Sequence, residues 1–138
     1  MVEARQQAAG TQSPFRFLYM SGSSAERDQA KKPLVLPAYM LMRGETENRV
    51  LAFAAEQQPA GSVEACVAKP GMITSSASAG QAVMGTVLGW MSVVSVPSVS
   101  VEELAAAMLQ QVRDGFEKEP LLNEDLQRIG RGVLAQMA

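Results

Sequence analysis

The sequence of 138 residues has no histidine and only one cysteine, Cys66. Without histidine, a catalytic triad with an imidazole base is excluded, and so is every metal site that needs a histidine ligand. A single cysteine cannot form an internal disulfide, and Cys66 lies in an apolar run, Val63 to Val67, where a small buried residue is expected. We therefore expect a structural thiol and a reducing, cytoplasmic compartment.

An excess of basic charge is also missing, with 12 Lys and Arg residues against 14 Asp and Glu residues. The net charge of −2 and the scattered cations argue against a nucleic-acid partner. Met1 to Gln12 has no apolar run of the kind found in a secretory signal, because Glu3 interrupts it. We expect a protein that is not secreted.

A long, strongly hydrophobic run is absent as well. The segment from Ala82 to Val96 is uncharged and moderately apolar, but it contains Gly85 and Gly89 and is followed by Pro97. It therefore falls short of the ~20 predominantly apolar residues that a membrane-spanning helix needs. We favour an apolar cover segment over a membrane span, and expect no membrane partner.

The composition that remains, 47% hydrophobic and 19% charged, is typical of one globular domain with a core of ordinary size. The apolar run from Phe15 to Met20 and the run at 62–68 predict two strands, and residues 38–57 have the periodicity of a helix. Parallel strands can be joined only through a crossover, for which this helix is suited. The order predicts an α/β fold with a parallel sheet.

The expected helix at 38–57 is amphipathic, and its pattern assigns one set of apolar residues to the core: Tyr39, Met42, Val50, Phe53 and Ala54. Charged residues such as Arg43 and Glu47 are assigned to the solvated face. Gly44 in the helix interior costs about 1 kcal/mol relative to alanine. Such a glycine indicates that something packs or binds close to the backbone there.

The last third of the chain is predicted to be helical. Ser100 and Glu103 form a capping-box pattern, and one helix is expected from there to Gly115, with a second at 123–135. Their apolar faces are predicted to cover the sheet, through Val101, Leu104, Ala105, Met108 and Val112 in the first helix and Leu126, Ile129, Val133 and Met137 in the second. A short extra strand is compatible with this arrangement. The single domain thus divides into a core at 15–71, an apolar cover at 72–99 over the carboxyl ends of the strands, and helices at 100–138.

Three residues in the core region have the chemistry of a reactive site. Tyr39 and Arg43 are four residues apart, so they project from the same face of a helix. A cation there stabilises a tyrosine phenolate and fits it for proton transfer, while Ser21, at the end of the first strand, can bind the same substrate oxygen. The alternative is structural: a rim tyrosine, a serine turn, and an exposed ion pair between Arg43 and Glu47.

Four strings resemble segments of the short-chain dehydrogenase/reductase family. FRFLYMSG, Phe15 to Gly22, is similar to that family's fifth strand and serine. RGETEN, Arg43 to Asn48, resembles the Lys-Gly-x-x-Glu-Asn of its atypical branch, which includes NmrA-like proteins and nucleoside-diphosphate-sugar epimerases. AKPGMI, Ala68 to Ile73, resembles the segment that meets the nicotinamide, and PSVSVEEL, Pro97 to Leu104, resembles a later helix start.

The resemblance implies the C-terminal half of a Rossmann-like domain and an NAD(P)-dependent oxidoreductase for a small apolar carbonyl or alcohol. It places Ser21, Tyr39 and Arg43 at the catalytic positions, and it assigns the nicotinamide segment to Pro70, Gly71, Met72, Ile73 and Thr74. Arg43 stands where the family has lysine, and no Gly-x-Gly-x-x-Gly occurs for the cofactor phosphates. The alternative is a non-catalytic or cofactor-independent remnant that acts as a binding or regulatory module.

The resemblance also implies a partner. In the complete family domain the strand that matches Phe15 to Met20 is paired on both sides, and here the first half of the sheet is not in the sequence. A bare strand edge rich in aromatic residues is seldom left unpaired. We therefore expect a homo-oligomer, or a separate chain that supplies the missing half, in addition to a small-molecule ligand.

Overall fold

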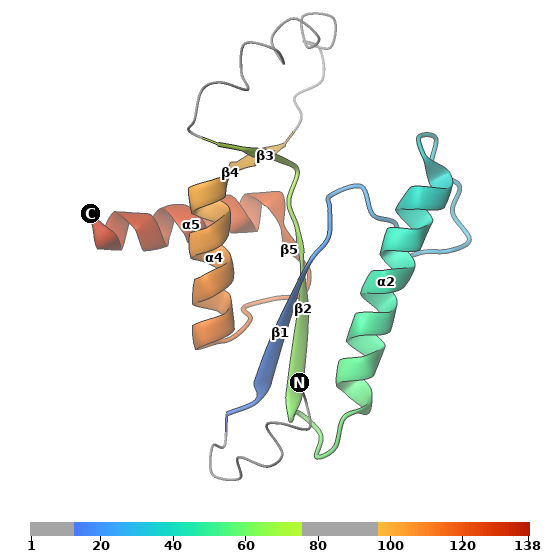
Figure 1. Cartoon of the computed structure of the whole chain (residues 1–138), viewed down its shortest axis with the longest axis horizontal. Coiled ribbons are helices and arrows are strands. Elements are labelled where there is room, and N and C mark those ends of the chain that lie inside the picture. Colours follow the sequence, from blue (N-terminus) through green and yellow to red (C-terminus); the bar gives the residue numbers. More distant parts are fainter. Residues whose placement is uncertain (1–12, 76–96) are drawn as a thin grey trace, which may run out of the picture.

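The computed structural model describes residues 13–75 and 97–138 (Figure 1). The first part contains β1 (Phe15–Met20), α2 (Pro37–Glu56), β2 (Val63–Lys69) and β3 (Met72–Thr74). The second part contains β4 (Ser98–Ser100), α4 (Val101–Asp114), β5 (Leu121–Leu122) and α5 (Asn123–Met137). The predicted strands and helices are therefore present, with bounds that differ by a few residues at most.

The main sheet has the order β1-β2-β5, and its strands are parallel. Phe15 pairs with Val63 and Met20 with Ala68, and α2 is the crossover between the two strands. The short β5 adds the extra strand, while β3 and β4 form a separate two-stranded parallel sheet. The prediction of an α/β fold with a small parallel sheet and flanking helices is confirmed.

The helices lie on both sides of the β1-β2 pair, with α2 on one side and α4 and α5 on the other (Figure 1). The buried core lies between the sheet and α4 and α5, and consists of Cys66, Ala68, Val99, Leu104, Ala107, Leu121, Leu126 and Ile129. Cys66 is fully buried within it, as expected for a structural thiol.

The predicted capping box is present at the start of α4. The backbone N–H of Glu103 donates to Oγ of Ser100 at 3.1 Å, and the N–H of Ser100 donates to Oε2 of Glu103 at 3.1 Å. Leu104, Leu126 and Ile129 are buried as predicted, but Val101, Val112 and Met137 are exposed because they lie near the ends of their helices.

The apolar face predicted for α2 is confirmed at Ala54 but wrong at Tyr39, Met42 and Phe53. Tyr39, Met42 and Phe53 are 49%, 53% and 52% exposed, and the buried residues of the helix are Gly44, Glu47 and Ala54. The cause is the loop at 21–36, which lies against the helix: the N–H of Glu26 donates to the carbonyl of Met40 at 3.0 Å. A Cβ on Gly44 would lie only 1.7 Å from the Glu26 carbonyl oxygen, so the close contact predicted at this glycine is confirmed.

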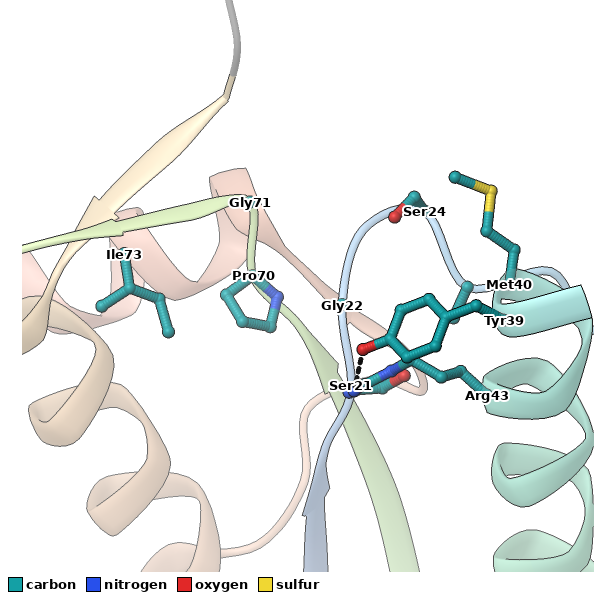
Figure 2. A pocket seen from close by; sticks show the side chains of 10 residues that line it. Ser21, Gly22, Ser24, Tyr39, Met40, Arg43, Pro70, Gly71 and Ile73 are labelled. Carbon is teal, nitrogen blue, oxygen red and sulfur yellow. Dashed lines mark hydrogen bonds between the residues drawn. The ribbon is translucent and has the colours of Figure 1, made fainter. Parts of the chain in front are cut away.

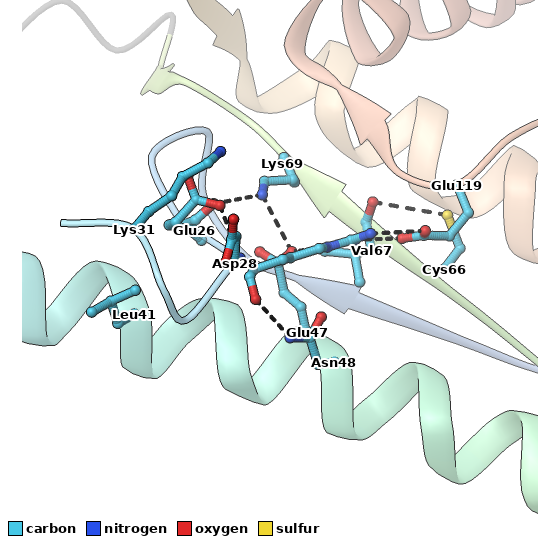
Figure 3. Close-up of polar contacts among 12 residues, drawn as sticks. Glu26, Asp28, Lys31, Leu41, Glu47, Asn48, Cys66, Val67, Lys69 and Glu119 are labelled. Carbon is cyan, nitrogen blue, oxygen red and sulfur yellow. Dashed lines mark hydrogen bonds and ion pairs between the residues drawn. The ribbon is translucent and has the colours of Figure 1, made fainter. Parts of the chain in front are cut away.

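Glu47 lies in a buried ion cluster and not on a solvated face (Figure 3). Its Oε2 is 2.6 Å from Nε of Arg27 and 3.2 Å from Nζ of Lys69. Arg27 also forms a bidentate pair with Glu119, whose carboxylate, together with that of Glu47, raises the pKa of Arg27. The predicted surface pair between Arg43 and Glu47 is therefore wrong, because two cations from other segments take the Glu47 carboxylate.

Two of the sequence predictions lie outside the described residues. These are the N-terminal segment up to residue 12 and most of the apolar cover, residues 76–96, which includes Ala82 to Val96. Among the residues that the structure describes, no helix has both the length and the apolar character needed to cross a membrane.

Candidate functional site

The predicted site residues meet at the carboxyl ends of β1 and β2. Ser21 directly follows β1, and its N–H donates to the carbonyl of Ala68 at 2.8 Å. Two residues later, the N–H of Ser23 donates to the carbonyl of Pro70 at 2.9 Å. These bonds fix the segment from Ser21 to Ser24, here called the serine turn, against the Pro70-Gly71 segment. Both lie at the edge where parallel sheets bind their ligands.

The first turns of α2 supply the other two residues. Nη1 of Arg43 donates a hydrogen bond of 3.0 Å to Oη of Tyr39, and the centre of the guanidinium lies 5.6 Å from the centroid of the tyrosine ring. The prediction that the two side chains share one helix face is confirmed. The helix starts at Pro37, directly after Leu36 in the left-handed conformation, which turns the chain toward the site.

These residues line a pocket of about 180 Å³ (Figure 2). Of the predicted residues, Ser21, Tyr39, Arg43, Pro70, Gly71 and Ile73 belong to its wall. Met72 and Thr74 do not, because successive side chains of β3 point to opposite faces and these two alternate with Ile73. Gly22, Ser24, Ala25 and Met40 also line the pocket and were not predicted, although their positions beside Ser21 and Tyr39 could have indicated them.

Two polar atoms of the pocket residues are buried and have no hydrogen-bond partner in the described parts of the chain. They are Oγ of Ser21 and Nε of Arg43. None of the described residues that line the pocket is acidic. In the described part of the chain the wall therefore offers a guanidinium and hydroxyl groups, and its charge is positive.

The Pro70-Gly71 wall is held in place by α5. The N–H of Gly71 donates to Oδ1 of Asn123 at 2.9 Å, and Nδ2 of Asn123 donates to the carbonyl of Ser98 at 3.0 Å. A Cβ at position 71 would lie 2.0 Å from the carbonyl oxygen of Pro97, so only glycine fits. This wall is thus fixed by contacts with residues distant in the sequence.

Lys69 is the neighbouring residue that sequence reasoning missed. The resemblance of the string Ala68 to Ile73 gives its side chain no role, but its Nζ is buried, donates to the carbonyl of Ala25 at 2.7 Å and pairs with Glu47 (Figure 3). Ala25 lines the pocket directly after the serine turn, so the hydrogen bond from Lys69 helps to fix that turn. The sequence signal that could have indicated this residue is a lysine at the end of an apolar strand and directly before a proline.

The residues present do not fit a whole dinucleotide. Pro70, Gly71 and Ile73, from the segment expected to meet the nicotinamide, line the pocket. The sequence has no Gly-x-Gly-x-x-Gly, and its one Gly-x-Gly, Gly130 to Gly132, lies inside α5 and not at a strand-to-helix turn. The volume of about 180 Å³ is also below the roughly 300–1,000 Å³ of pockets that hold drug-sized ligands.

No protein-family model matches this chain, and no curated protein matches it significantly.

Proposed function

We propose that the chain is an oxidoreductase of the short-chain dehydrogenase/reductase type that acts on a small carbonyl or alcohol. The observation that supports this proposal is the convergence on one pocket of Ser21, which follows β1, with Tyr39 and Arg43, which belong to α2 (Figure 2). Pro70 and Gly71, at the position expected for the nicotinamide, form part of the same wall.

In this proposal Tyr39 exchanges a proton with the oxygen of the substrate. The hydroxyl of Ser21 binds the same oxygen, and the hydrogen bond from Arg43 stabilises the charge that develops on Oη when the proton leaves. An arginine does not readily pass on a proton, so the proton of Tyr39 is exchanged with water, for which the half-exposed side chain is suited.

The resemblance makes NAD(P) the expected redox partner, which supplies or accepts a hydride when bound. Because only its nicotinamide end has matching residues, Pro70, Gly71 and Ile73, we assign this chain's own residues the tasks of binding, orientation and proton transfer.

The test is the reduction of short aliphatic ketones with NADPH or NADH by the full chain. Replacement of Tyr39 by Phe removes the proton donor and is expected to lower kcat by roughly 100-fold or more. Tyr19→Phe is the matched control, because Tyr19 lies on β1 and does not line the pocket. Turnover that survives in Tyr39→Phe, or is lost equally in Tyr19→Phe, contradicts the assignment.

A second candidate function is a cofactor-independent binding module. The observation that favours it is the absence of a glycine-rich phosphate turn from the sequence, together with the small volume of the pocket. Such a module binds a small ligand in the Ser21 pocket without turnover, and its affinity does not depend on a nicotinamide cofactor.

We further propose that β1 associates with β1 of a second copy. Among the described strands β1 pairs only with β2, at one end of the sheet. The N–H groups of Phe15 and Ser21 point to β2, so by the two-residue period of a strand the backbone groups of Arg16, Leu18 and Met20 point to the outer edge. Phe17 and Met20 are 38% and 46% exposed beside it. Antiparallel pairing around a two-fold axis would cover this edge.

A further inference from the structure

The guanidinium of Arg43 has no ion-pair partner among residues 13–75 and 97–138. The nearest acids on the same helix are already used: Glu47 pairs with Arg27 and Lys69, and Glu45 pairs with Arg49 at 2.6 Å. Arg43 is partly buried, and its Nε is fully buried without a partner. A partly buried cation without a counter-ion is unfavourable unless something supplies the negative charge.

A second group in the same pocket also lacks a partner. Ser21 is only 6% exposed, its Oγ has no hydrogen-bond partner in the described parts of the chain, and it lines the pocket together with Arg43 (Figure 2). A buried hydroxyl that makes no bond costs free energy that a ligand oxygen can recover. Both incomplete groups thus point to a ligand with oxygen acceptors and a negative charge.

We propose that the pocket binds the carboxylate of a small molecule, with Arg43 as the cationic partner and Ser21 as a hydroxyl partner. A planar guanidinium matches a carboxylate, and its single charge neutralises one negative charge and not the two of a phosphate. Met40 and Ile73, which also line the pocket, suit a short aliphatic body. The inference rests on the proposed function, because it names the substrate class of the same site: a small carbonyl or alcohol that also carries a carboxylate.

The test compares two probes that differ only in the charged group, α-ketoisovalerate and methyl isopropyl ketone. Each is titrated into the full, isotope-labelled chain without cofactor, and the dissociation constant is obtained from NMR shifts. We expect the ketone to bind roughly 10-fold or more weakly than the acid, as the loss of a charge-assisted hydrogen bond requires. Equal affinities, or no binding of the acid at tens of millimolar, would overturn the proposal.

Variants distinguish the effect of Arg43 on binding from the effect of the overall charge of the protein. Arg43→Gln is expected to weaken binding of the acid by about 10-fold or more, with Arg43→Lys intermediate and the ketone unaffected. Arg49→Gln, which removes an exposed cation from the same helix, should change neither. Acid binding that Arg43→Gln leaves intact contradicts the assignment, and so does inorganic phosphate that competes as well as the acid. The dispersion of each variant's spectrum shows whether it is folded.

The two proposals fail in different ways. Tyr39→Phe retains the guanidinium, so it should bind the acid within about 3-fold of the unmodified chain while losing turnover. If the unmodified chain binds the acid but shows no turnover, the oxidoreductase proposal is wrong and the carboxylate site stands. If the neutral ketone is turned over with the same kcat/KM as the acid, the carboxylate-site proposal is wrong and the oxidoreductase proposal stands.

Discussion

Arg27 donates a 2.6 Å hydrogen bond from Nε to Oε2 of Glu47, and the Glu47 side chain is fully buried. The bond joins the loop at 21–36 to the middle of α2, and Lys69 links the same carboxylate to the end of β2. Because the Glu47 carboxylate is already paired with Arg27 and Lys69, Arg43 faces the pocket with Tyr39. One buried carboxylate thus both holds the serine turn in place and determines the charge of the site.

Replacement of Glu47 by Gln should therefore destabilise the fold strongly. The change leaves Arg27 and Lys69 without their shared anion, and removal of one partner from a buried ion pair typically costs about 3–5 kcal/mol. Glu45→Gln is the matched control, since its exposed pair with Arg49 is expected to contribute less than about 1 kcal/mol. Urea unfolding gives both values; a similar small change in the two variants would show that the cluster does not stabilise the fold.

Two of the glycines inside helices, Gly44 and Gly132, should respond in opposite directions to alanine. Gly132→Ala in α5 places a Cβ in open space and should stabilise the protein by up to about 1 kcal/mol through helix propensity. Gly44→Ala places its Cβ 1.7 Å from the Glu26 carbonyl oxygen, so the loop must move and stability should fall by roughly 1–3 kcal/mol. Thermal unfolding compares them directly, and stabilisation by both changes would exclude the close contact.

Cys66 should be unreactive in the folded protein. Burial, with a smaller contribution from the charge of Glu119, raises the pKa of its thiol from 9.0 to about 11. At a given pH below 9 this leaves roughly 100-fold less thiolate than in the unfolded chain. We expect slow labelling by a maleimide at pH 8 and rapid labelling in denaturing urea; equal rates would contradict burial.

The same shift predicts how stability changes with pH. Because the folded pKa of Cys66 lies above the unfolded value, the unfolded chain loses its proton first as the pH rises. The contribution of the thiol to the free energy of unfolding is thus complete below about pH 9 and is lost between 9 and about 11. Cys66→Ala should show a shallower decline over that range in urea titrations at each pH, and an equal slope would show that another group is responsible.

Association through β1 is tested by sedimentation at micromolar concentration. The unmodified chain should sediment as a dimer, and Phe17→Lys should shift it toward monomer, because a charge beside the outer edge opposes strand pairing. A cooperative thermal transition in the variant shows that it remains folded. Val35→Lys provides a control of equal charge on an exposed apolar residue distant from β1 in the sequence. A compact, cooperatively melting monomer of the unmodified chain would remove the proposal.

Local patterns were sufficient to predict much of the fold and to bring several candidate residues to one pocket. β1 and β2 are mostly apolar, and Ser100 with Glu103 is a complete helix-start signal, so each could be recognised from neighbouring residues. Ser21 and Pro70 could be placed together because the carboxyl ends of parallel strands meet at one edge of the sheet.

The buried face of α2 could not be predicted in the same way. Periodicity assigns a charged residue such as Glu47 to solvent, whereas its burial depends on Arg27 and Lys69, each about 20 residues away along the chain. The two-residue β5 is likewise too short to show an alternating pattern, and it is defined only by its pairing with Ala68 and Lys69. Contacts between distant segments, and not local propensity, determine these features.

The most direct test of the proposed oxidoreductase is titration of the purified chain with NADPH, NADH and reduced nicotinamide mononucleotide, followed by nicotinamide fluorescence. Only the nicotinamide end has matching residues, at Pro70, Gly71 and Ile73, so the mononucleotide should bind within a few-fold of the dinucleotides. Arg43→Gln should weaken the binding of all of them, and Arg49→Gln should not. Saturable binding at or below millimolar cofactor is the predicted result. If none of these probes binds at millimolar concentration, the nicotinamide-dependent function is contradicted.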